Sequence, residues 1–163
     1  MSDEIEFAVV DAGGDSARWA MTQYFTELDQ RFPHGFDPGN AVEEAAVVMN
    51  PPNGVFVLAM RGDHVAGCGG VQCLDAGTAE IKRMWISAGA RGRGLGRRLL
   101  TRLEDEAGRF GCDRVVLDTN GVLLPAIAMY RSAGYAEIDR YNDNPYAEHW
   151  FAKTLDHELS PET

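Results

Sequence analysis

The stretch from residue 79 to residue 111 constrains the fold most, because an extended pattern gives way to a helical one across a short loop. Residues 79–87, AEIKRMWIS, alternate enough to predict a strand. After the loop, apolar residues recur every four positions along one face of a predicted amphipathic helix: Leu95, Leu99, Leu103 and Ala107. Gly111 ends this helix, and the run 113–119 has strand character. Two strands joined in this way are expected to be parallel neighbours linked by a right-handed crossover.

Regular elements are predicted along the rest of the chain as well. Ser16 is suited to cap the first helix, and the Pro- and Gly-rich stretch 31–39 separates that helix from the second. In full, the predicted strands are 5–10, 54–60, 65–75, 79–87, 113–119, 135–141 and 149–155, and the predicted helices are 16–30, 39–49, 95–110 and 123–134. This order indicates the α+β class, with a central mixed sheet of about seven strands flanked by about four helices.

The length of 163 residues suits one domain, predicted at 1–156, followed by a short C-terminal tail at 157–163. No apolar run is long enough to span a membrane, and the acidic N-terminus lacks the basic region of a signal peptide. The three cysteines form no Cys-x-x-Cys pair and the four histidines show no ligand spacing, so no metal site is expected. The odd number of cysteines also favours a reducing, cytoplasmic location.

Arginine and glycine are concentrated in the loop after the predicted strand 79–87. The chain has a net charge of −10, yet five arginines and three glycines fall between residues 91 and 102. The first N–H groups of a helix lack internal partners and carry partial positive charge, and glycine lets an anion approach the backbone. Arginine adds charge-assisted bonds to phosphate oxygens. We therefore expect a site for a phosphorylated small molecule, against the simpler interpretation of a turn beside a solvated helix.

Two common phosphate loops and a DNA-binding helix fit these residues less well. No Lys-Ser or Lys-Thr follows Gly96, as a P-loop would need. In a dinucleotide-binding G-x-G-x-x-G the third glycine would stand one position later than Gly96 does after Gly92 and Gly94. A basic helix at 91–102 could contact nucleic acid, but the overall negative charge argues against a nucleic-acid partner.

Residues 91–96 read Arg-Gly-Arg-Gly-Leu-Gly. This run matches the signature Gln/Arg-x-x-Gly-x-Gly/Ala of the GNAT family of N-acetyltransferases, which the chain resembles. Residues 80–86 resemble the family's fourth strand, and 117–120, Leu-Asp-Thr-Asn, its fifth strand and the start of the next loop. Residues 125–135, PAIAMYRSAGY, resemble the helix that carries a tyrosine and ends in Gly-Phe/Tyr. The resemblance covers nearly the whole chain, most specifically 79–135.

The resemblance implies a single GNAT-like domain that uses acetyl-coenzyme A as co-substrate, without a metal. In the family the fourth and fifth strands splay apart, and the pantetheine arm fills the gap along the fourth strand. The backbone amides of the signature loop hold the pyrophosphate. Carried over to this chain, the implied cofactor-binding residues are Met84, Trp85, Ile86, Arg91, Gly92, Arg93, Gly94, Leu95, Gly96, Arg97 and Asn120.

The reaction implied by the resemblance is direct attack of an amine on the thioester. Such a reaction benefits from a base that takes the amine proton and an acid that protonates the leaving thiolate. Tyr130 matches the family's tyrosine and is the candidate acid; the alternative is a packed core tyrosine. Glu80 is the candidate base, acting directly or through water, although it could instead form a surface ion pair with Lys82. Asp118 is the second candidate base.

Strand alternation assigns the side chains of residues 80–86 to two faces. One face would carry Glu80, Lys82, Met84 and Ile86, and the other Ile81, Arg83 and Trp85. The candidate base and the implied cofactor-binding residues Met84 and Ile86 are thus expected on the same side of the sheet.

In this family the acceptor side is built from the first two helices, the loop between them and the last hairpin. The matching segment 141–150, YNDNPYAEHW, is rich in aromatic and amide side chains, and Asn144-Pro145 predicts a turn between the last two strands. The candidate residues for binding a small polar amine or amino acid are Tyr24, Phe25, Phe36, Tyr141, Asn142, Tyr146 and His149. A hairpin turn with a dimer contact would explain segment 141–150 about equally.

The leading hypothesis is thus an acetyl-coenzyme A-dependent N-acetyltransferase whose partner is a small-molecule amine. A non-catalytic coenzyme A-binding sensor and the acetylation of a protein amine are the alternatives. No nucleic-acid or membrane partner is expected, and a homodimer stays open.

Overall fold

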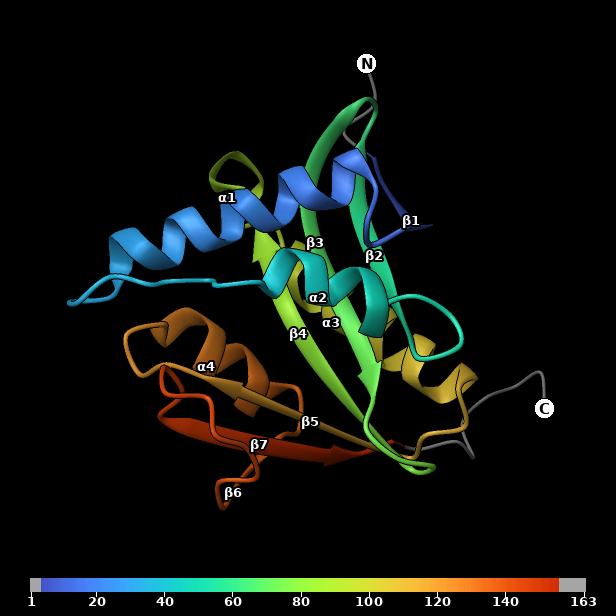
Figure 1. The fold of residues 1–163 in the computed structure, drawn as a ribbon, viewed down its shortest axis with the longest axis vertical. Helices are drawn as coiled ribbons and strands as arrows, with labels where there is room; N and C mark the ends of the chain where they lie inside the picture. The colour runs from blue at the N-terminus through green and yellow to red at the C-terminus, as the bar shows by residue number, and fades with distance from the viewer. Residues whose placement is uncertain (1–3, 156–163) are drawn as a thin grey trace.

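The computed structural model describes residues 4–155, so residues 1–3 and 156 of the predicted domain and the whole predicted tail 157–163 lie outside the described residues. Within that range seven strands form one mixed sheet and four α-helices cover it (Figure 1). The strands are β1 (Ile5–Val10), β2 (Gly54–Arg61), β3 (His64–Cys73), β4 (Thr78–Ile86), β5 (Arg114–Thr119), β6 (Ala136–Ile138) and β7 (His149–Thr154). The helices are α1 (Asp15–Arg31), α2 (Ala41–Val48), α3 (Leu95–Arg109) and α4 (Leu124–Ser132), with a 3₁₀ turn at Ala88–Ala90.

The strand order is β1-β2-β3-β4-β5-β7-β6, and only the β4–β5 pair within the described sheet is parallel. The α+β class and the parallel crossover through α3 are therefore confirmed. Pairing between β4 and β5 is confined to Thr78–Glu80 against Arg114–Val116. Beyond these residues the two strands diverge, as Figure 1 shows, so the splay implied by the family resemblance is present.

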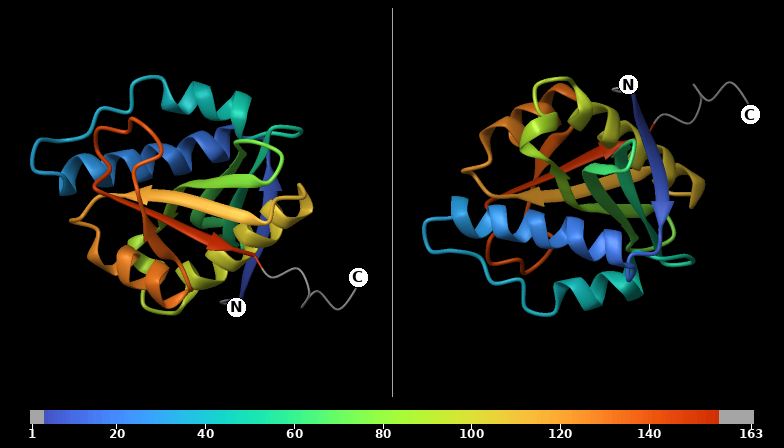
Figure 2. Two further views of the ribbon diagram at one scale, coloured as in Figure 1. Left: turned by 90° about the horizontal axis from the view of Figure 1, so that it is seen from below. Right: turned by 90° about the horizontal axis from the view of Figure 1, so that it is seen from above.

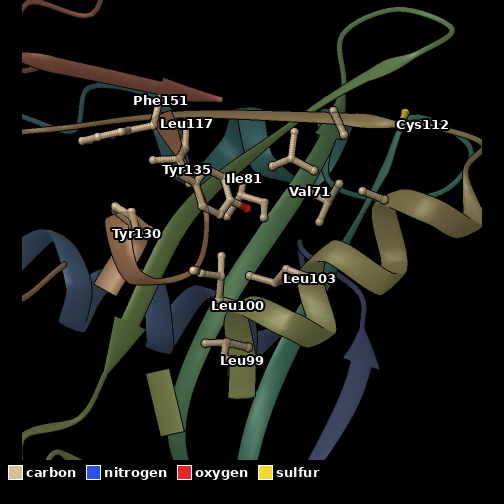
Figure 3. Close-up of a cluster of buried hydrophobic side chains, with 14 of the residues drawn as sticks. Val71, Ile81, Leu99, Leu100, Leu103, Cys112, Leu117, Tyr130, Tyr135 and Phe151 are labelled. Carbon is tan, nitrogen blue, oxygen red and sulfur yellow. The ribbon is translucent and has the colours of Figure 1, made fainter. Parts of the chain in front are cut away.

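Two hydrophobic clusters lie on opposite faces of the sheet. Figure 2 shows α1 and α2 on one side and α3 and α4 on the other. Figure 3 shows the α3 side, where buried leucines of the helix pack against side chains of β3, β4, β5 and β7: Leu99, Leu100, Leu103, Val71, Ile81, Leu117 and Phe151. All four residues of the predicted apolar helix face are buried. Each large apolar side chain buried in this way contributes about 1.5–3 kcal/mol, which fixes α3 and the loop before it against the sheet.

The ends of the helices show where local signals hold and where they fail. Gly111 follows the last turn of α3 with φ +86°, as predicted for a glycine at that position. Ser16 does not cap α1, because the helix already begins at Asp15 with Gly14 as its N-cap. The carboxylate of Asp11 accepts the N–H of Gly13 at 2.8 Å and orders the turn, so the helix starts earlier than predicted. None of the described helices is both long and apolar enough to cross a membrane.

A bulge in β4 makes the predicted alternation wrong from Arg83 onward. Arg83 and Met84 together lie opposite the single residue Gly69 of β3, between two regular pairs. Arg83 has φ +59°, an unusual value for a residue with a side chain, and its carbonyl accepts the Cys68 thiol at 3.3 Å. Because of the extra residue, each later side chain of β4 lies on the side of the sheet opposite to the predicted one.

The reversal changes which layer each β4 side chain joins. Met84 and Ile86 pack with Ile81 in the α3 cluster, whereas Trp85 packs in the cluster of α1. Arg83 turns to the α1 side as well, where its guanidinium lies 5.8 Å from the ring centroid of Phe25. The sequence pattern carries no signal for this change, because alternation assumes regular pairing.

The last hairpin also differs from the prediction. The expected strand 135–141 is reduced to β6, Ala136–Ile138. Residues 139–148 form a long loop that reaches the α1 side of the molecule (Figure 2). Its side chains Tyr141 and Asn142 bond to carboxylates of β4 and β5 instead of extending the sheet. The turn expected at Asn144 is present, since the N–H of Ala147 donates to its carbonyl at 3.2 Å.

Candidate active site

The loop between β4 and α3 forms one wall of a cavity of about 410 Å³, here called the loop cavity. Gly94 is the N-cap of α3 with φ +76°, and Gly92 has φ +81°, so both use backbone conformations that favour glycine. None of the backbone N–H groups of residues 92–97 donates to a described residue. Free N–H groups at the N-terminus of a 15-residue helix make a site for a phosphate anion.

The rest of the loop cavity lies beside the gap between β4 and β5. The β4 backbone beyond Glu80 has no partner strand on the β5 side, so its amides are available to an extended ligand. Helix α3 approaches α4 so closely that a Cβ on Gly96 would come within 3.2 Å of the Met129 sulfur. The lining outside the loop is mostly apolar and comes from β4, α1 and α4: Met84, Trp85, Ile86, Tyr24, Glu27, Leu28, Arg31, Leu123, Pro125, Ala126, Met129 and Tyr130. Such a cavity fits a molecule with an anionic end at α3 and an extended arm along β4.

Of the five arginines between residues 91 and 102, only Arg91 lines this cavity. Its guanidinium, however, donates to the carbonyl of Ile86 at 2.9 Å and pairs with Glu27. Arg93 and Arg97 do not line it, and Arg93 makes no ion pair with a described residue. The remaining arginines contact their neighbours: Arg97 with Ser132, Arg98 with Phe7, and Arg102 with Glu106. The donors that this cavity offers to an anion are therefore mainly backbone N–H groups rather than arginine side chains.

Glu27 is a site residue that sequence reasoning missed. It lies on α1, and its carboxylate accepts the indole N–H of Trp85 at 3.2 Å as well as the guanidinium of Arg91. Arg31, one turn later, pairs with its other oxygen at 3.1 Å. These bonds tie α1 to the end of β4 and to the loop. Its partners Trp85 and Arg91 are 58 and 64 positions away in the chain, so no local sequence pattern predicts these bonds.

A second cavity of about 410 Å³, here called the aromatic cavity, adjoins the first. Four of the predicted acceptor residues line it, namely Tyr24, Phe25, Phe36 and Tyr146. Phe36 stacks on Phe25 at 5.5 Å and lies 4.5 Å from Tyr146, measured between ring centroids. The Tyr146 hydroxyl accepts the N–H of Asp37 at 3.0 Å and so ties the last loop to the α1–α2 connection.

Three predicted acceptor residues lie outside the aromatic cavity, and Asn120 lies outside the loop cavity in which it was expected. Tyr141, Asn142 and His149 line neither cavity; His149 pairs with Glu137 at 2.7 Å on the outer β6–β7 edge. Asn120 lines the aromatic cavity rather than the loop cavity, and its amide donates to the carbonyl of Tyr146 at 2.8 Å. The structure therefore places Asn120 in the aromatic cavity, where its hydrogen bond holds the last loop against the end of β5.

Tyr130 lies where the two cavities meet and lines both of them. The ring belongs to the α3-side cluster, 5.9 Å from Tyr135 and 6.1 Å from Phe151 (Figure 3). Its hydroxyl makes no hydrogen bond with a described residue, unlike the hydroxyls of Tyr135 and Tyr141. Burial, followed by the negative charge of Asp118, raises the pKa of Tyr130 to about 12. The phenol is therefore protonated at neutral pH.

Glu80 is buried and held in a network, but it lines neither cavity. Its carboxylate accepts the hydroxyl of Tyr141 at 2.6 Å and the amide of Asn142 at 3.4 Å. Lys82 lies 3.9 Å away, so the expected ion pair exists, with a buried carboxylate. Burial raises the pKa of Glu80 above its ordinary value, although Lys82 and the Tyr141 hydrogen bond act in the opposite direction.

Asp118 lines the aromatic cavity at the end of β5. Its two oxygens accept the side-chain amides of Asn142 at 2.6 Å and Asn144 at 3.2 Å. Asn142 therefore bridges Asp118 and Glu80, and the indole of Trp150 donates to its oxygen at 2.9 Å. A carboxylate has about four acceptor positions, so Asp118 can accept a further proton or hydrogen bond from the cavity. No group of three or more metal-ligating side chains occurs among the residues that the structure describes.

Comparison with known proteins places these features in one family. The model of the Acetyltransferase (GNAT) family matches residues 18–135. A relative from Azospirillum brasilense, named IAA acetyltransferase, is 41% identical over 92 residues, which cover 56% of this chain and 59% of that protein. The chain spans 59%, 60% and 62% of the length of three curated relatives that it matches.

Solved structures share the fold. A GNAT family acetyltransferase from Staphylococcus aureus Mu50 superposes with a TM-score of 0.81 at 18% identity, covering 94% of this chain and 100% of that one. A putative acetyltransferase from Salmonella typhimurium, solved with its cofactor acetyl-CoA, gives a TM-score of 0.70 at 17% identity and covers 96% of this chain and 97% of that one.

Proposed function

The chain belongs to the Acetyltransferase (GNAT) family, and we propose that it moves the acetyl group of acetyl-coenzyme A to a primary amine of a small molecule. One observation carries the proposal: the loop cavity and the aromatic cavity adjoin, and they share Tyr130. A donor bound along β4 and an acceptor bound among the aromatic rings would therefore meet beside that hydroxyl. The other shared lining residues are Tyr24, Leu28, Met84, Leu123 and Ala126.

The loop cavity supports acetyl-coenzyme A as the donor. The unpaired N–H groups of residues 92–97 would hold the pyrophosphate, and the unpaired β4 backbone near Met84 to Ile86 would bind the amide-containing arm. When bound, this co-substrate supplies an activated acetyl group on a thioester. With the donor bound, the apolar side chains of α4 would exclude water from the gap and limit hydrolysis.

The acceptor amine must reach the thioester without its extra proton. An alkylamine with a pKa of about 10.4 is neutral in only about one molecule in 2,500 at pH 7, a cost of about 4.6 kcal/mol. We place Asp118, rather than Glu80, in position to take that proton, because Asp118 lines the aromatic cavity. Glu80 would act through Asn142, which it shares with Asp118.

Tyr130 fits the part of general acid. Its raised pKa keeps the phenol protonated, and its hydroxyl is not engaged by any described side chain. Because a thiol has a pKa near 8.5, the phenol would donate a hydrogen bond to the developing thiolate rather than lose its proton outright. A positioned acid of this kind contributes about 10²–10⁴-fold in rate.

The lining favours direct attack over a covalent acetyl-enzyme. No cysteine or serine among the described residues lines either cavity. The three cysteines lie in β3 and in the loop before β5, and none of them lines either cavity. The thioester carbon would thus be attacked by the acceptor itself.

A panel of amines, amino acids and peptides assayed with acetyl-coenzyme A tests the proposal. We expect thiol release and a mass increase of one acetyl group on a small amine, both lowered in Tyr130→Phe. Acetylation of peptides alone would indicate a protein amine as the acceptor. Coenzyme A binding without any acetyl transfer would contradict the proposal and favour a sensor.

A further inference from the structure

A buried arginine with unused hydrogen-bond donors lines the aromatic cavity. The side chain of Arg83 is only 6% exposed. Its Nη2 donates to the carbonyl of Ala41 at 3.2 Å and lies 3.7 Å from a carboxylate oxygen of Glu44. Nε is buried without a hydrogen-bond partner, and Nη1 donates to no described residue. One of five possible donor hydrogens is thus engaged in a hydrogen bond within the described chain.

Nothing around Arg83 compensates fully for burying its charge. Glu44 is 54% exposed and not within hydrogen-bond distance, so solvent screens its attraction. A buried guanidinium without such compensation is unfavourable. The φ of +59° at the same residue adds backbone strain. Strain and an unsatisfied polar group at one residue are typical of a binding site.

The other cation in this lining is already balanced. Lys82 lies 3.9 Å from the buried carboxylate of Glu80, so its charge has a partner of opposite sign. Arg83 is therefore the cation whose charge remains available to a ligand in the aromatic cavity. Burial lowers the pKa of Arg83 below its ordinary value, but a guanidinium remains charged at neutral pH.

We propose that Arg83 binds a carboxylate of the acceptor, which defines the acceptor as a small amine that also carries a carboxylate. The planar guanidinium suits this group because it can donate two parallel N–H bonds to the two oxygens. The rings of Phe25, Phe36 and Tyr146 form the apolar wall of the same cavity, so an aromatic or aliphatic side chain fits beside the carboxylate. The amine would then face Asp118 and Tyr130. In naming the ligand an acceptor, the inference rests on the proposed acetyl transfer.

The carboxylate site can be tested without any acetyl transfer. Calorimetric titrations compare 3-phenylpropionate with 3-phenylpropan-1-ol, which has the same ring and chain but no charge. We expect the carboxylate to bind at least about tenfold more tightly to the wild type, and Arg83→Met to abolish the difference. Equal binding of the two ligands by the wild type would overturn the proposal.

A matched control is Arg18→Met. Arg18 also reaches α2, where it pairs with Glu43 at 3.7 Å, but it lines neither cavity. The carboxylate preference should survive in this variant. Its loss in Arg18→Met to the same extent as in Arg83→Met would show a general charge effect and contradict a site at Arg83.

Glu44→Gln keeps the proposal falsifiable if Arg83→Met does not fold. Glu44 is more than half exposed, so its replacement leaves the core unchanged. Removing its charge frees Arg83, and we expect 3-phenylpropionate to bind a few-fold more tightly; unchanged or weaker binding contradicts the proposal. Coenzyme A titrations of the same samples report the loop cavity separately. Failure of acetyl transfer with Arg83-dependent carboxylate binding intact would contradict the enzyme function and leave this site standing.

Discussion

The two cavities that meet at Tyr130 are built in different ways. In the loop cavity, one continuous stretch, residues 84–97, supplies the backbone groups that would bind the donor, while α1 and α4 add mostly apolar side chains to the lining. The aromatic cavity is assembled from side chains of α1, the α1–α2 loop, β4, β5 and the loop before β7. Recognition by backbone tolerates many side chains, whereas recognition by side chains changes with each substitution. We therefore expect recognition of the donor to depend on local backbone conformation, and recognition of the acceptor on packing between distant segments.

The largest expected effect comes from breaking the loop cavity alone with Gly94→Val. A β-branched side chain at φ +76° is strained by about 1–2 kcal/mol and displaces the N–H groups of the first turn of α3. Losing two charge-assisted hydrogen bonds of about 1.5–3 kcal/mol each weakens acetyl-coenzyme A binding at least about 100-fold. Calorimetry with coenzyme A measures the loss.

Gly62→Val is the control for strain, because Gly62 has φ +59° in the β2–β3 turn, far along the chain from either cavity lining. It should lose similar stability in urea but keep its coenzyme A affinity. Equal affinities in both valine variants would show that the loop does not bind the donor.

The next largest effect is expected at Tyr130, which lines both cavities. We expect Tyr130→Phe to lower kcat by about 100-fold, the lower end of the contribution of a general acid, with little change in coenzyme A affinity. Tyr135→Phe serves as its control, since that hydroxyl donates to Glu104 at 2.8 Å and lines neither cavity. An equal fall of kcat in both variants would contradict a general-acid role for Tyr130 and indicate that its ring acts only in packing.

A smaller effect is expected from the aromatic cavity alone. Tyr146→Phe removes the hydroxyl that accepts the Asp37 N–H, a bond worth about 1 kcal/mol. Its loss loosens the wall of the aromatic cavity, so the KM of the acceptor should rise by up to about fivefold if binding must restore the order of that wall, while the KM of acetyl-coenzyme A stays unchanged. A change in the donor KM instead would show that the cavities do not bind separate substrates.

The smallest effect is a change in the pH dependence of stability. Because burial raises the pKa of Glu80, the folded protein binds this proton more tightly than the unfolded chain. The penalty for burying the carboxylate is fully present above the raised pKa and is relieved as the pH falls through it. Urea unfolding should therefore show the wild type gaining stability relative to Glu80→Gln as the pH falls from about 7 toward 4.5. A constant difference between the two proteins would contradict this.

Sequence reasoning predicted more of the lining of the loop cavity than of the aromatic cavity, because much of the loop cavity comes from residues close together in the chain. The strand, the glycine loop and the leucine face of α3 are encoded within about thirty consecutive residues, where local pattern is informative. Eight of the eleven implied cofactor-binding residues line the loop cavity. Glu27 was missed because its partners lie on β4 and in the loop, far along the chain.

The aromatic cavity shows where such reasoning ends. The bulge at Arg83 turns that side chain toward α1, against the alternation of the strand, so its place in the cavity was not predicted. Tyr141 and Asn142 bond to the carboxylates of Glu80 and Asp118 because the loop 139–148 replaces the expected strand. Contacts between residues far apart in the chain determine the positions of Arg83 and of this loop. A single sequence carries no information about such pairs.

Initial-rate kinetics with both substrates varied test the central claim most directly. If donor and acceptor occupy the two adjoining cavities that share Tyr130, we expect both to be bound together before transfer, with no acetyl-enzyme between them. Double-reciprocal plots against the acceptor, at several fixed concentrations of acetyl-coenzyme A, should give lines that intersect. Parallel lines, together with a protein mass increased by one acetyl group in the absence of acceptor, would contradict the account.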